Sequence, residues 1–111
     1  MKDTIANRQL LNRLQAMCAG TPYDMRIRER EGDISPSLFT RRDAPKYTPA
    51  FYLYDDLCFT GAFTISVQTT SYGALAPESI LQVAHGLMAA AQLAHDMSVQ
   101  IQLAGYRVSG E

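Results

Sequence analysis

Apolar residues recur at helical spacing near the start of the chain and again near its end. In the first of these segments the apolar positions are Ile5, Leu10, Leu11, Leu14, Met17 and Cys18. Spacings of three and four residues are typical of a helix with one buried face. Asp3 or Thr4 supplies a cap before it and Gly20 a stop after it. The second segment begins at Pro77, which suits the first helical turn, and is expected to end near residue 97.

Between the two helices, apolar and polar residues alternate, which is the pattern of strands with one buried face. The first such stretch is 23–31, where Tyr23, Met25 and Ile27 alternate with arginines. Residues 50–59 predict a bent strand or a tight hairpin around Asp55 and Asp56, and residues 62–70 predict a further strand. Residues 98–103 alternate again, so they predict either a last short strand or a continuation of the helix.

The segment 33–49 contains three prolines and little periodicity, so we expect a long irregular loop there. Loops of this length in compact domains are usually functional or mobile. The predicted order is therefore α-β-β-β-α with a possible terminal strand. We expect a single α+β domain over 1–111, in which two helices pack on an antiparallel sheet of three to four strands.

The second helix carries no charged side chain from Ser79 to His95. Its small residues Gly86, Ala90 and Ala94 are spaced by four and form a ridge that allows close approach of another backbone. In one interpretation, the chain's own sheet and first helix cover this helix. In the other, the helix packs on a second copy in a symmetric homodimer. The candidate dimer interface is then Gly86, Ala90, Leu93, Ala94 and Met97.

Composition, the first residues of the chain and the cysteines predict a globular, cytoplasmic protein. The chain has 111 residues and 47% hydrophobic residues, enough for one core. Its first residues lack the pattern of a secretory signal, and polar residues interrupt its most apolar segment, so we expect no membrane span. Cys18 and Cys58 lie among apolar neighbours, which predicts buried, reduced thiols.

The basic residues are concentrated in the first part of the chain. Residues 1–48 have a formal charge of +3, whereas residues 49–111 have −4. Such asymmetry can mark a surface for an anionic partner. The candidate partner-binding residues are Arg26, Arg28, Arg30, Arg41, Arg42, Lys46 and Tyr47. Acidic residues are interleaved with them, so a simple solvated surface is the alternative interpretation.

No residue pattern predicts a catalytic or cofactor site. His85 and His95 lie on different sides of one helix, and the two cysteines are not closely spaced, which is unlike a structural zinc site. Asp55 and Asp56 are interpreted as turn residues, and no glycine-rich phosphate loop is present. His95 is expected in the core and His85 in solvent.

By elimination we expect no enzyme, no metal and no cofactor. The leading hypothesis is a small adaptor, inhibitor or regulator that acts through an unidentified protein partner, of the compact kind that mobile genetic elements encode. The alternative is a nucleic-acid-binding module that uses the basic strand and loop. A homodimer is expected in the second interpretation of the uncharged helix, and a membrane partner is not expected.

Overall fold

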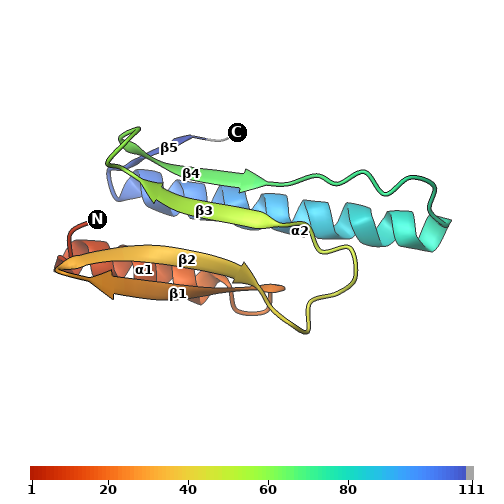
Figure 1. Cartoon of the computed structure of the whole chain (residues 1–111), viewed down its shortest axis with the longest axis horizontal. Helices are drawn as coiled ribbons and strands as arrows, with labels where there is room; N and C mark the ends of the chain where they lie inside the picture. The colour runs from red at the N-terminus through yellow and green to blue at the C-terminus, as the bar shows by residue number, and fades with distance from the viewer. Residues whose placement is uncertain (110–111) are drawn as a thin grey trace.

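The structure is a computed structural model, and it describes residues 1–109 of the chain. Along the chain the elements are α1 (Ile5–Met17), β1 (Tyr23–Arg30), β2 (Asp33–Thr40), β3 (Phe51–Asp56), β4 (Ala62–Val67), α2 (Pro77–Leu103) and β5 (Arg107–Ser109) (Figure 1). The α+β class and both helices agree with the sequence prediction. Thr4 caps α1, because its Oγ1 accepts a hydrogen bond of 3.1 Å from the amide of Asn7.

The strands form two sheets rather than one. β1 and β2 are an antiparallel hairpin, in which Tyr23 pairs with Thr40 and Arg30 with Asp33. β3 and β4 form a second hairpin, and β5 pairs with β4 in parallel. The expected single antiparallel sheet is therefore wrong in two respects: the sheet is divided between β2 and β3, and the terminal strand runs parallel to its neighbour.

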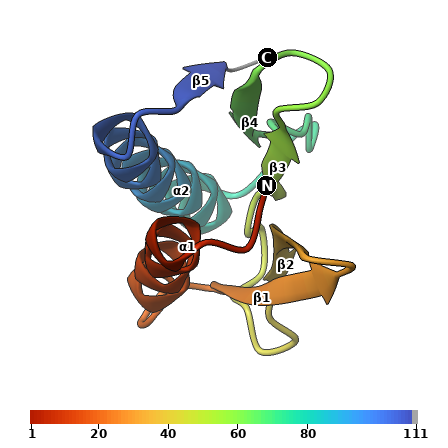
Figure 2. The same ribbon diagram turned by 90° about the vertical axis from the view of Figure 1, so that its left-hand side faces the viewer.

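Both helices lie on one side of the strands (Figure 2). α1 buries Leu10, Leu11 and Leu14 toward the strands. The buried residues of α2 are Ala90, Leu93, Met97 and Ile101. These two sets belong to one hydrophobic cluster with residues of β1 to β4, including the fully buried Phe63. Among residues 1–109, no helix lies over the opposite side of either sheet.

The segment predicted as an irregular loop begins with a regular strand. Residues Asp33–Thr40 are β2, and only residues 41–50 form the connection to β3. Pro36 is compatible with this strand because of the direction of its amide. Ile34 exchanges two backbone hydrogen bonds with Met1, of 2.8 and 3.0 Å, on the side away from β1. Alternate residues face the same way, so Pro36 lacks an N–H only on the edge that faces β3.

Met1 lies at the division between the two sheets. Besides its bonds to Ile34 of β2, its ammonium group forms an ion pair of 2.6 Å with Asp55 of β3. The two side chains are only 1% and 7% exposed. Asp55 and Asp56 are thus the last residues of β3 and not the turn that we predicted. The reversal occurs over residues 57–61 and includes Gly61 with φ of +70°, a conformation that favours glycine.

The second helix is longer than the sequence pattern predicted. It continues through 98–103, where alternation of apolar residues had also predicted a strand, and ends at Leu103. Met97 and Ile101 are both fully buried, because their spacing of four keeps them on the helix face that covers β4. The short strand β5 follows after Gly105 and Tyr106.

Candidate binding face

The uncovered side of the strands carries aromatic and hydroxyl side chains. In β3, Phe51 and Leu53 are buried whereas Tyr52 and Tyr54 are exposed. The register places Tyr52 opposite Ser66 and Tyr54 opposite Thr64 of β4. Because successive side chains of a strand point to opposite faces, these four residues share the face that no helix covers.

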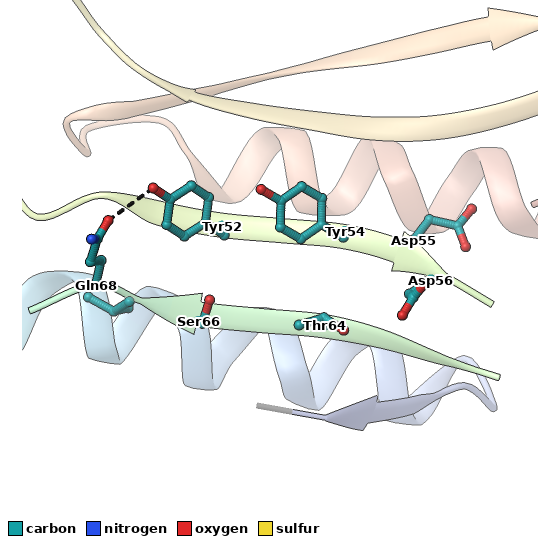
Figure 3. Close-up of a pocket in the computed structure, with 8 residues that line it drawn as sticks. Tyr52, Tyr54, Asp55, Asp56, Thr64, Ser66 and Gln68 are labelled. Carbon is teal, nitrogen blue, oxygen red and sulfur yellow. Dashed lines mark hydrogen bonds between the residues drawn. The ribbon is translucent and has the colours of Figure 1, made fainter. Parts of the chain in front are cut away.

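Tyr52 and Tyr54 form a stacked pair on this face (Figure 3). Their ring centroids are 6.0 Å apart and the ring planes differ by 11°. The hydroxyl of Tyr52 donates a 3.0 Å hydrogen bond to Gln68 Oε1. An open pocket of about 750 Å³ lies beside the rings and is also lined by Thr64 and Ser66.

A second hollow lies on the other side of the tyrosine pair, over the division between the two sheets. It has a volume of about 310 Å³, and its lining includes Arg28 of β1, Ser37 of β2, Tyr52 and Tyr54. The tyrosine pair therefore forms a wall between two hollows, one lined by neutral polar groups and the other reached by an arginine. We call this surface the open strand face and define it by Arg28, Ser37, Tyr52, Tyr54, Thr64, Ser66 and Gln68.

Arg26, Arg28 and Arg30 line the outward side of β1, as the sequence predicted. All three are exposed, and among residues 1–109 none of them has an acidic partner within ion-pair distance. The guanidinium carbon of Arg26 lies 5.4 Å from the ring centroid of Phe39, in a cation–π contact. Arg28 brings positive charge to the hollow beside the tyrosine pair, whereas Arg26 and Arg30 border a separate hollow that also includes Asp33 and Asp55.

The other predicted basic residues lie at the opposite end of the hairpin from Arg30. Arg41 donates two hydrogen bonds to Asp43, of 2.8 and 3.0 Å, so its charge is largely compensated. The ammonium group of Lys46 lies 5.1 Å from the ring centroid of Tyr47. Arg42 is exposed in the same connection. The structure thus does not unite the seven predicted residues in one surface.

The connection between β2 and β3, residues 41–50, contacts both the core and the start of α2. The hydroxyl of Tyr23 donates a 2.5 Å hydrogen bond to the carbonyl of Pro49. The rings of Tyr47 and Tyr72 meet edge-on, with their centroids 5.1 Å apart. A hydrogen bond with the Ser79 side chain lowers the pKa of Tyr47. These contacts hold the second half of the predicted loop in place.

The residues predicted as a dimer interface are covered by the chain itself. Ala90 and Met97 are fully buried, and Leu93 is 6% exposed. Ala94 packs partly buried against the core, and Gly86 lies against the segment Tyr47–Pro49. This ridge therefore follows the first interpretation, coverage within one chain, and is not accessible to a second copy.

The cysteines and histidines differ from the prediction at two positions. Cys18 is buried as expected, but Cys58 is exposed in the turn after β3. His95 is exposed, like His85, because it lies on the side of α2 away from the strands. Within residues 1–109, no group of three His, Cys, Asp or Glu side chains is placed to hold a metal ion. Over the same residues, neither helix has the combination of length and apolarity that crossing a bilayer requires.

Sequence reasoning missed Tyr52 and Tyr54. Their alternation with Phe51 and Leu53 was the available signal, because it places both rings on the face opposite the core.

Comparisons of the chain with models of known families, with curated proteins and with solved structures gave no match.

Proposed function

We propose that this protein is a non-enzymatic binding module whose open strand face recognises an acidic segment of another protein. The observation that carries the proposal is the exposed, stacked pair of Tyr52 and Tyr54 beside Arg28. Tyrosine and arginine are enriched at the energetic centres of protein interfaces. A stacked pair also loses little conformational freedom on binding, because each ring already limits its neighbour.

The charge on this face indicates the chemistry of the partner. Arg28 of this face has no ion-pair partner among the described residues, and neither do Arg26 and Arg30 on the same strand. All three can therefore pair with carboxylates of an acidic segment. The hydroxyl groups of Ser37 and Ser66 supply further hydrogen-bonding groups along the two hollows. An aspartate- or glutamate-containing segment with an apolar residue for the tyrosine wall fits this arrangement.

A selection of random peptides displayed on phage tests this proposal. Peptides are selected on the parent protein alone, and synthetic copies are then measured against the parent and against Arg28→Glu and Tyr54→Ser as single variants. We expect the enriched sequences to contain acidic residues beside an apolar one. Synthetic copies should lose at least about tenfold in affinity, or 1.4 kcal/mol, when either change is made alone.

Two matched variants control for surface charge and for loss of an exposed ring. Arg13→Glu reverses an exposed charge on α1, and Phe59→Ser removes an exposed ring from the β3–β4 turn. Neither should alter peptide affinity. Selected peptides that bind equally well to all four variants would place the binding surface elsewhere on the molecule.

The second candidate ligand is single-stranded nucleic acid. It is favoured by one observation, the shared hollow of Arg28 and the two tyrosines, because bases stack on aromatic rings while arginines contact the phosphates. The formal net charge of −1 and the Arg41–Asp43 pair argue for the protein partner. Anisotropy of a labelled mixed-sequence oligonucleotide separates the two: nucleic-acid binding must weaken steeply with salt and must depend on Arg28 and Tyr54.

The proposed site of action is the cytoplasm. Both cysteines are free thiols, and free thiols persist in reducing compartments. An adaptor or inhibitor of this size would act by occupying its partner's surface and not by chemical turnover.

A further inference from the structure

The N-terminal half of α2 has an uncovered apolar face. Figure 1 shows this half extending past the ends of α1 and of the strands, with the segment before Pro77 running beside it. Leu81 is 58% exposed and Met88 is 70% exposed. Ala84 is half-buried and Ala91 is exposed. Burying large apolar side chains such as Leu81 and Met88 is favourable, and within residues 1–109 most of the surface of both stays uncovered.

These four residues form a continuous stripe. Their spacings of three, four and three residues are those of a helix–helix seam, and at 100° per residue they fall within about 80° of arc. Ala90 and Met97, which face the core, lie on the other side of the helix. We call Leu81, Ala84, Met88 and Ala91 the outer stripe. It is distinct from the ridge that the core covers.

We propose that the outer stripe packs antiparallel on the same stripe of a second copy of this chain. The stripe complements itself about one point. Leu81 and Ala91 are equally distant from position 86, and so are Ala84 and Met88. An antiparallel pair centred there sets Leu81 against Ala91 of the second copy, and Met88 against Ala84 of the second copy, so each large side chain meets a small one.

The parallel arrangement lacks this complementarity. It sets leucine against leucine and alanine against alanine, which alternates crowded layers with voids, and both are unfavourable in packed contacts. The absence of charge from Ser79 to His95 means that neither arrangement buries an ionised group.

The fold leaves room for this pairing. α1 lies beside the C-terminal part of α2, where Arg13, Ala16 and Met17 border a groove with Asp96, Val99 and Gln100. In a pair centred on position 86, residues 96–100 of each copy lie beyond the Pro77 end of the other helix. Each α1 therefore lies beyond the end of the second copy's helix, opposite its residues 72–76.

The size of the contact determines the expected strength of association. The stripe spans about 15 Å of helix at 1.5 Å per residue, so the interface is smaller than the roughly 1,200–2,000 Å² that stable complexes bury. We therefore expect a reversible dimer that forms at micromolar concentrations, and a dimer fraction that rises with concentration in sedimentation velocity.

A charge-complementation experiment tests the pairing. Met88→Lys and Ala84→Glu should each abolish dimerisation, because each buries an unpaired charge. Mixing the two variants should restore a one-to-one heterodimer, since the new lysine then faces the new glutamate. Ala89→Glu is the matched control, because Ala89 is exposed on another side of the same helix and should leave dimerisation unchanged. Recovery in the mixture also shows that both variants remain folded.

Cysteine cross-linking tests the register independently. In a Cys58→Ser background, chains with Ala84→Cys and chains with Met88→Cys should form a disulfide-linked dimer when they are mixed and oxidised. Each should cross-link poorly alone. Efficient cross-linking of either variant alone would indicate the parallel pair and overturn the proposal, as would a parent protein that stays monomeric at several hundred micromolar.

The outer stripe and the open strand face lie on different elements. Failure of the dimer tests therefore leaves peptide binding by Tyr54 and Arg28 intact, and failure of the peptide tests leaves the dimer prediction intact.

Discussion

The ammonium group of Met1 and the carboxylate of Asp55 form an ion pair of 2.6 Å between residues with largely buried side chains, at the division between the two sheets. Met1 also bonds to the backbone of Ile34. No β-ladder joins β2 to β3, so this first residue links the hairpins with polar contacts where the sheet itself does not. The remaining contact between the hairpins is side-chain packing.

Replacing Asp55 with Asn should therefore lower the free energy of unfolding by about 3 kcal/mol, because it leaves a buried cation without its partner. Urea denaturation measures the loss. Asp56→Asn is the matched control: Asp56 has no ion-pair partner among residues 1–109, and its change should cost less than about 0.5 kcal/mol. Equal losses in the two variants would contradict a specific role for the Met1–Asp55 pair.

A second proline one residue further along β2 should destabilise the first hairpin. Ser37 pairs with Arg26, and its backbone amide points toward β1. Ser37→Pro therefore removes a hydrogen bond between β1 and β2 and should cost about 3 kcal/mol. Pro36→Ser restores an N–H only at the edge facing β3 and should cost far less. Thermal unfolding by circular dichroism compares the two variants. The opposite ranking would show that the assigned amide directions in β2 are wrong.

Gly86 should tolerate no large side chain. A Cβ at this position would lie 3.3 Å from Pro49 Cδ and 3.4 Å from the carbonyl oxygen of Tyr47. Gly86→Leu must displace this segment, and inserting bulk into a packed contact typically costs about 1 to 3 kcal/mol.

Limited proteolysis reports this displacement directly. Trypsin should cleave Gly86→Leu after Lys46 faster than it cleaves the parent protein, while Ala89→Leu, on an exposed side of the same helix, should leave the rate unchanged. An unchanged rate in Gly86→Leu would mean that the contact with residues 47–49 does not hold the connection in place.

Stability should fall as the pH rises above 9. Burial raises the pKa of Tyr23 from its ordinary value of 10.0 to about 12. Burial, with a smaller effect of Asp24, raises the pKa of Cys18 from 9.0 to about 11. A raised pKa in the folded state means that the stability is fully present below the unfolded pKa and is lost as the pH rises through the folded pKa.

Urea midpoints measured from pH 8 to 11.5 should therefore decline with the steepest change above pH 10. Tyr23→Phe should reduce this decline, at a cost near neutral pH of about 1 kcal/mol for the lost hydrogen bond to Pro49. Tyr54→Phe, which removes an exposed hydroxyl, should follow the parent curve. A decline of equal size in Tyr23→Phe and the parent protein would assign it to other groups.

Local patterns predicted most of the elements but not how the strands associate. The spacing of Leu10, Leu11 and Leu14 indicated α1, and alternation in residues 23–31 indicated β1. β2 was not predicted because it contains Pro36. A strand can accommodate a proline only where the missing N–H would not bond to the neighbouring strand. The direction of the amide at Pro36 follows from the bonds between Ile34 and Met1, which are distant in the sequence.

The binding surfaces were less predictable than the elements. Arg26, Arg28 and Arg30 were correctly placed on one strand face, because alternation is a local property. Their proximity to Tyr52 and Tyr54 depends on how the two hairpins sit side by side. The uncharged composition of α2 indicated burial, but it did not show which of two apolar stripes the core would cover. Ala90, Leu93 and Met97 are buried in the core, whereas the outer stripe is largely exposed.

The division between the sheets also shapes how the chain folds. All antiparallel pairing lies within two hairpins whose strands are adjacent in sequence, and such local contacts favour rapid folding. α1 and the first hairpin can associate while the chain is still being synthesised. Other contacts join residues that are far apart in the sequence. Met1 pairs with Asp55, and β5 pairs with β4 although the whole of α2 lies between them in the sequence. The contacts of Met1 with Asp55 and of β5 with β4 therefore close much longer loops than the pairing within either hairpin.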